Sequence, residues 1–130
     1  MSAVEKDVLP PIIDELRRCR NWIEDALAYS GGTHDFEDIV RGVLSGHMQL
    51  WAGDSGCAVT EISVYPKKKV LHVFLAAGDM EQILDFEESA AEFARQNGCA
   101  NMTLAGRSGW RRVLGKRNWR EQFAVLERDI

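Results

Sequence analysis

The segment from residue 70 to residue 105 constrains the fold of this chain more than any other. It opens with a near-continuous apolar run, Val70–Ala77. Such a strand is typical of the middle of an α/β fold, where both faces of the sheet are covered. Residues 80–97 then carry apolar side chains at helical spacing, and Asn97-Gly98 is a typical helix stop. A second strand follows at 100–105, so the segment predicts a right-handed βαβ crossover with two parallel strands.

The rest of the chain predicts further helices and strands around this crossover. Pro10-Pro11 opens a first helix that ends at Ser30-Gly31-Gly32, and Thr33 or Asp35 caps a second helix. The remaining elements, in chain order, are strand candidates at Met48–Ala52 and Cys57–Tyr65, a charged hairpin loop at Pro66–Lys69, a short helix around Trp110–Leu114 and a final strand-like run at Phe123–Leu126.

Composition indicates a soluble globular domain and argues against several classes of protein. The 130 residues fit one domain, 1–130, without repeats or a linker. No stretch is apolar for long enough to span a membrane, and no signal peptide is visible, so we expect a cytoplasmic protein that binds no membrane. The net charge of −4 makes nucleic acid an unlikely partner. The three cysteines and three histidines lack metal-site spacing, so we expect no metal.

The order of these elements resembles the C-terminal half of the GNAT-type N-acetyltransferases. The resemblance is carried by Gly106–Leu114 and Asn118-Trp119, which lie between the strands at 100–105 and 123–126. More narrowly, the chain is similar to short GNAT-like proteins of tailed phages and prophages. The expected fold is α/β, with a mixed central sheet, two N-terminal helices, one βαβ crossover and a short C-terminal helix plus strand. The family's first strand is either lost or hidden in Ser2–Val8.

The resemblance places a cofactor loop at Ala77, Gly78 and Asp79. In the family, a Gln/Arg-x-x-Gly-x-Gly/Ala loop holds the coenzyme A pyrophosphate through backbone N–H groups. This chain keeps one glycine and has acids at Asp79 and Glu81, which repel phosphate. The family's proton-donating tyrosine corresponds to Leu114, which cannot donate a proton. We therefore expect no cofactor to bind tightly, and acetyl-CoA only if the chain is an active enzyme.

Two strand residues are candidates for proton transfer if the chain is active. Glu61 and His72 lie on the two strands of the Pro66–Lys69 hairpin and meet on one face if the loop length allows. The family's general base is often a strand glutamate. The structural alternative is that Glu61 lies at an edge and that His72 is a hydrogen-bonded, semi-buried strand residue.

The basic C-terminal segment is a candidate interface. Tryptophan and arginine are enriched in protein interfaces, although the tryptophans also suit a core. The candidate residues are Arg107, Trp110, Arg111, Arg112, Lys116 and Trp119. Together these features favour a catalytically degenerate protein of phage or prophage type that binds a protein partner, such as another virion component. The alternative is an active acetyl-CoA-dependent N-acetyltransferase acting on a small amine or a protein amino group. The oligomeric state is not determined by the sequence.

Overall fold

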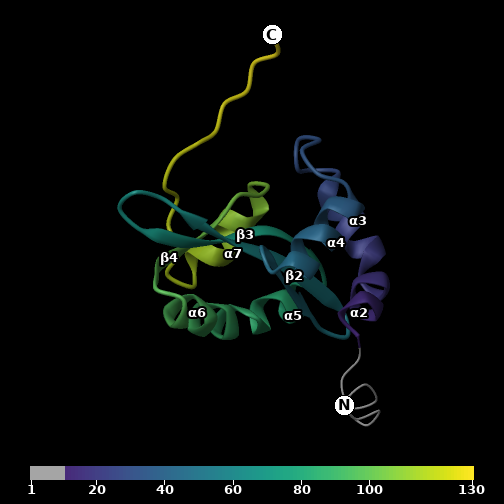
Figure 1. Cartoon of the computed structure of the whole chain (residues 1–130). Helices are drawn as coiled ribbons and strands as arrows, with labels where there is room; N and C mark the ends of the chain where they lie inside the picture. The colour runs from purple at the N-terminus through teal and green to yellow at the C-terminus, as the bar shows by residue number, and fades with distance from the viewer. Residues whose placement is uncertain (1–10) are drawn as a thin grey trace.

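Four strands form one mixed sheet in the computed structural model, which describes residues 11–130 (Figure 1). The strands are β1 (Met48–Ala52), β2 (Gly56–Val64), β3 (Lys69–Gly78) and β4 (Cys99–Leu104), and they lie side by side in that order. β1 and β2 are antiparallel, as are β2 and β3, whereas β3 and β4 are parallel. The predicted α/β class and βαβ crossover are therefore confirmed.

Helices cover both faces of this sheet. The first face carries α2 (Ile12–Arg18), α3 (Arg20–Leu27) and α4 (Phe36–Ser45), and the second carries α5 (Met80–Asp85) and α6 (Glu87–Gln96). α7 (Gly109–Gly115) follows β4. Figure 1 shows the first group and the pair α5–α6 on different sides of the strands.

Two expected helices are each divided in the structure. The first is divided between α2 and α3 at Cys19, and the helix expected at 80–97 is divided between α5 and α6 at Phe86. At Phe86 the backbone N–H bonds to Ile83 O, which tightens the chain into a turn. α4 begins as predicted, because Asp35 accepts from the Asp38 N–H and the Asp38 side chain accepts from the Asp35 N–H.

The core consists of one cluster on each face of the sheet. The larger cluster joins α2, α3 and α4 to the first face, with buried residues Leu16, Cys19, Ile23, Leu27, Phe36, Ile39, Met48, Cys57, Val59 and Leu75. The smaller one joins α6 to the second face through Leu71, Ala90 and Ala94. Burial raises the pKa of the Cys57 thiol to about 12, so this cysteine is a neutral core residue near pH 7.

A β-bulge in β3 changes which side chains reach each face. Val59 pairs with Leu75 but the next residue, Thr60, pairs with Val73, so Phe74 is an extra residue in β3. Phe74 and Leu75 both pack against the larger cluster. Ala76 consequently returns to the face that carries α5 and α6, where it lines a cavity.

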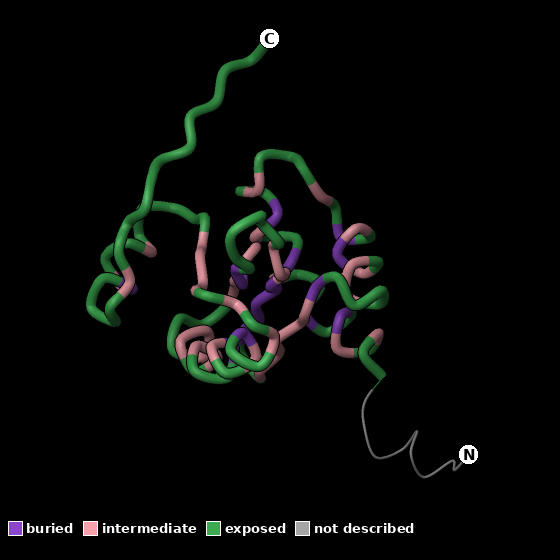
Figure 2. The backbone as a smooth tube through the Cα atoms, turned by 60° about the vertical axis from the view of Figure 1, so that its left-hand side comes forward, coloured by how far each residue is buried: buried purple, intermediate pink, exposed green. Residues whose placement is uncertain are grey.

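The expected strand at Phe123–Leu126 is not formed, which corrects that element of the prediction. Residues 119–130 have no regular secondary structure, and Phe123, Val125 and Leu126 are 71%, 82% and 92% exposed. The segment leaves the body of the molecule (Figure 1) and is exposed throughout its outer part (Figure 2). A strand forms only with a partner, and within residues 11–130 the sheet ends at β4.

Two further expectations concern a first strand near the N-terminus and a membrane-spanning segment. The family's first strand, if hidden in Ser2–Val8, lies outside the described residues. No helix in residues 11–130 combines the length and the apolar character that crossing a bilayer requires.

Candidate functional site

A row of polar side chains crosses three strands on the first face of the sheet. Glu61 on β2 pairs with His72 on β3, and His72 pairs with Thr103 on β4. Directly paired residues place their side chains on the same face. The His72 Nδ1 and Thr103 Oγ1 atoms are 2.8 Å apart. The structure therefore brings the two predicted residues Glu61 and His72 together and adds Thr103, which the sequence analysis missed.

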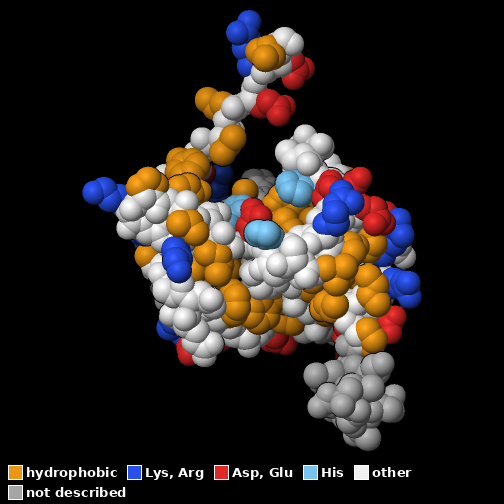
Figure 3. All heavy atoms as spheres, viewed as in Figure 1, with side chains coloured by type: hydrophobic (Ala, Val, Ile, Leu, Met, Phe, Trp, Pro, Cys, Tyr) orange, Lys and Arg blue, Asp and Glu red, His pale blue; other side chains and the backbone are white. Residues whose placement is uncertain are grey.

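Burial controls the charge state of His72. Removal from water lowers the pKa of the His72 imidazole, while the charge of Glu61 opposes this effect. His72 is consequently neutral at pH 7, and one of its ring nitrogens can accept a proton. In Figure 3, histidine side chains gather beside an acidic side chain in a hollow near the middle of the visible face. The residues described by the structure include no group of three or more His, Cys, Asp or Glu side chains arranged to hold a metal ion.

The connection between α3 and α4 lies over this face beside the C-terminal half of β3. The His34 and Phe74 rings are 4.6 Å apart between centroids, and the Arg107 guanidinium carbon lies 4.0 Å from the centre of the Tyr29 ring. The Arg107 contact joins the β4–α7 loop to the end of α3, and it brings a tyrosine near β4 that is distant in the sequence. Arg107, predicted as an interface residue, is thus engaged within the chain.

The predicted cofactor loop is reduced to a tight turn. Gly78 ends β3 with φ of +104°, and only Asp79 separates β3 from α5. The Asp79 N–H donates to Ser55 O at 2.8 Å, and the Asp79 side chain accepts from the Gln82 N–H. Ala77 pairs with Cys57 and Gly78 with Gly56, so the β1–β2 turn lies directly against this end of β3. Coenzyme A binding at Ala77, Gly78 and Asp79 stays a prediction.

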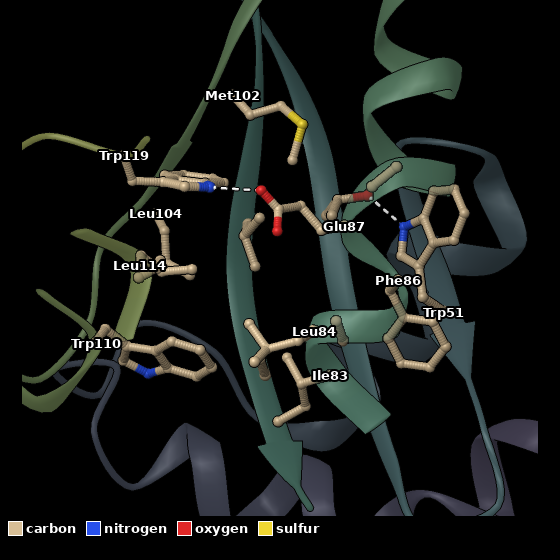
Figure 4. Close-up of a pocket in the computed structure, with 15 residues that line it drawn as sticks. Trp51, Ile83, Leu84, Phe86, Glu87, Met102, Leu104, Trp110, Leu114 and Trp119 are labelled. Atoms are coloured by element: carbon tan, nitrogen blue, oxygen red, sulfur yellow. Dashed lines mark hydrogen bonds between the residues drawn. The ribbon is translucent and has the colours of Figure 1, made fainter. Parts of the chain in front are cut away.

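An apolar cavity lies on the second face, between the sheet and α5, α6 and α7 (Figure 4). Its volume is about 50 Å³. One water molecule requires roughly 10–15 Å³ on the same scale, so the cavity has room for a small chemical group. Val73 and Ala76 contribute from β3, Leu104 from β4, and Trp110 and Leu114 from α7. Leu114 is buried there, at the position that the resemblance gives to a tyrosine.

The two tryptophans of the predicted interface face this cavity instead of solvent. Trp110 and Trp119 are half-buried, and Figure 4 shows both rings directed toward the cavity. The Trp119 Nε1–H donates to Glu87 Oε2 at 2.8 Å, and the Arg117 Nε–H donates to Glu87 Oε1 at 2.6 Å. Glu87 is not among the site residues that the sequence predicts. Its carboxylate joins α6 to the segment that follows α7.

The remaining basic residues of the predicted interface lie on the exposed surface of α7 and its C-terminal end. Arg111 pairs with Glu121 at 3.3 Å. Arg112 and Lys116 are exposed and form no ion pair within residues 11–130. Of the predicted interface residues, Arg112 and Lys116 are therefore exposed, whereas Trp110 and Trp119 are half-buried.

Comparison with known proteins identifies the fold. No protein-family model matches the sequence, and no curated protein is significantly similar to it. Among solved structures, an acetyltransferase of Trypanosoma brucei is 14% identical with a TM-score of 0.58, over 74% of this chain and 78% of that one. A protein of Bacillus halodurans, solved as a tetramutant, is 12% identical with a TM-score of 0.58, over 75% and 76%. A GNAT family acetyltransferase of Staphylococcus aureus is 10% identical with a TM-score of 0.53, over 90% and 93%.

These similarities show that the chain has the GNAT acetyltransferase fold. Because the sequence identities are only 10–14%, these similarities show the fold and not the function, since one fold hosts many functions. The function therefore depends on the residues of the site.

Proposed function

We propose that this chain is a GNAT-fold protein that has lost the usual coenzyme A site and acts as a binding component. The observation that carries the proposal is the one-residue connection between β3 and α5. A pyrophosphate needs several free backbone N–H groups at the start of a helix. Here the Asp79 N–H is bonded to Ser55 O and the Gln82 N–H to the Asp79 side chain.

The cavity beside α7 supports the same proposal. Trp110, Leu114 and Trp119 occupy the space between α7, α5 and the ends of the strands. Leu114 offers no proton to a departing thiolate.

The partner in this proposal is a protein with an acidic surface, contacted through Arg112 and Lys116. Both cations are exposed, and they lie four residues apart, so they share one side of α7 and its C-terminal end. A location in a virion or a prophage-bearing host is the further part of the proposal, and it is supported by the sequence resemblance alone.

Titration calorimetry with coenzyme A tests the loss of the cofactor site. We expect no binding, or binding far weaker than low micromolar, because Asp79 and Glu81 repel phosphate and the N–H groups of Asp79 and Gln82 are already bonded. The Glu81→Gln variant is the matched comparison, since it removes one charge and leaves the Asp79 cap in place. We expect only a small gain from it. A low-micromolar dissociation constant for the unmodified chain would overturn the proposal.

The second candidate function is acetyl transfer from acetyl-CoA to an amine. The observation that favours it is the row Glu61, His72 and Thr103, in which a neutral imidazole lies beside a carboxylate. The amine nitrogen would bond to the acetyl carbon, and the carbon–sulfur bond of acetyl-CoA would break to release the coenzyme A thiolate. The amine must also lose a proton, which Glu61 or His72 would accept directly or through water.

In this second candidate, replacing Glu61 by Gln should lower the rate of acetyl transfer by about 100-fold or more, because general base catalysis contributes effects of that size. Acetyl-CoA and a lysine-containing peptide serve as substrates. Glu37→Gln, which changes an exposed glutamate at the start of α4, is the control and should keep the full rate. An unchanged rate in Glu61→Gln would eliminate the assigned role.

A further inference from the structure

The cavity between the sheet and α5, α6 and α7 owes its volume to small residues on three elements. Ala58 of β2, Ala76 of β3 and Ala90 of α6 all line it, and large side chains such as Trp51 and Trp110 close around them (Figure 4). Protein interiors contain few voids larger than one water molecule. The volume of about 50 Å³ has room for roughly three to five water-sized groups, so it exceeds what ordinary packing leaves.

Three departures from regular secondary structure meet at this cavity. The β-bulge in β3 turns Ala76 toward it, and the chain breaks between α5 and α6 at Phe86, which also lines it. Beside α7, Asn118 has a φ of +70°, which is uncommon for a residue with a side chain. The next residue, Trp119, donates to the Glu87 carboxylate and lines the cavity. Bulges and unusual backbone conformations are concentrated at functional sites, which favours a binding site over a packing defect.

The hydrogen bonds of the lining determine what suits the cavity. Five lining side chains carry a polar atom: Trp51, Thr60, Glu87, Trp110 and Trp119. Thr60 Oγ1 accepts from the Trp51 Nε1–H at 3.0 Å and donates to Gln49 Oε1 at 2.8 Å. The Glu87 carboxylate accepts from Trp119 and from Arg117. A polar group that leaves water for such surroundings loses hydrogen bonds that the lining does not replace, so the cavity favours an apolar occupant.

We propose that this cavity binds a small molecule through a short, unbranched alkyl chain of about three or four carbons. The chain would lie among the three alanines, between β3 and the tryptophans of the α7 segment. The row Glu61, His72 and Thr103 lies on the other face of the sheet, so this binding requires neither that row nor coenzyme A.

Titration of the full chain with 1-butanol, followed by the amide and indole signals in NMR spectra, tests the site. We expect saturable shifts at Ala76, Ala90 and Trp110, with a dissociation constant of about 1–10 mM, a range typical of a ligand with so few atoms. The matched comparison is 1,4-butanediol, which has the same carbon chain and a second hydroxyl. It should bind at least about tenfold more weakly, because that hydroxyl would enter the apolar cavity.

Variants that fill or enlarge the cavity complete the test. Ala76→Leu should abolish the shifts, because the larger side chain fills the space from β3. Ala100→Leu enlarges an exposed residue of β4 and should bind 1-butanol as the unmodified chain does. Leu114→Ala acts in the opposite direction and should admit benzene at least about tenfold more tightly than the unmodified chain, which keeps the test if Ala76→Leu does not fold.

Four results would each overturn the site. They are shifts that do not saturate, equal affinity for the two alcohols, unchanged binding in a folded Ala76→Leu variant, and no gain in benzene affinity in Leu114→Ala.

Discussion

Replacing Gly78 by Ala should destabilise the fold by about 3 kcal/mol, measured as the free energy of unfolding in denaturant. Gly78 has a φ of +104°, which strains any side-chain-bearing residue. A Cβ at this position would also lie 2.5 Å from both the Gly56 Cα and the Ser55 O. Because both are backbone atoms, the β1–β2 turn would have to move away from the end of β3.

Gly98→Ala is the matched control for this prediction. Gly98 also has a positive φ, +75°, but a Cβ there meets no atom within 4 Å. We expect a loss of about 1 kcal/mol from the backbone conformation alone. Equal losses in the two variants would show that the β1–β2 turn moves easily to admit a side chain at position 78.

Leu71→Ala should have an effect of similar or larger size, about 2–5 kcal/mol. The Leu71 side chain is fully buried and packs with Ala90 and Ala94 of α6, so its removal leaves a cavity in the smaller core cluster. Chemical denaturation provides the measurement. Leu44→Ala, at an exposed position of α4, is the control and should change stability by about 0.5 kcal/mol or less.

A loss below about 1 kcal/mol in Leu71→Ala would contradict the described packing of α6 against β3. The result also bears on the candidate site, because Leu71 precedes His72 in the same strand. Leu71 packs on the second face of the sheet, and the His72 side chain lies on the first.

The sequence predicts the fold well where a pattern is local. The apolar run at Val70–Ala77 and the Asn97-Gly98 stop define the βαβ crossover, and the structure has it. The breaks at Cys19 and Phe86 have no glycine or proline to mark them, and each depends on how the flanking helices pack. The strand expected at Phe123–Leu126 has a suitable composition, but a strand also requires a partner, which no local pattern can reveal.

In the candidate site, the sequence likewise predicts contacts within one hairpin but not contacts between distant segments. Glu61 and His72 were predicted together from the hairpin between them, and the register places them opposite each other. Thr103 and Tyr29 were missed, because their contacts with His72 and Arg107 join segments far apart in the chain. The sequence is compatible with a core or an interface role for Trp110 and Trp119, and the position of α7 decides between the two.

The extra residue Phe74 divides β3 into two stretches of opposite phase. Before it, even-numbered residues such as His72 face α2–α4, and after it odd-numbered residues such as Ala77 do. If the same residues formed a regular strand without the bulge, Leu75 and Ala76 would exchange faces, which would direct a leucine into the cavity beside α7. The free volume on one face of the sheet is therefore set by a single insertion in the strand, and His72, which lies before that insertion, would keep its orientation.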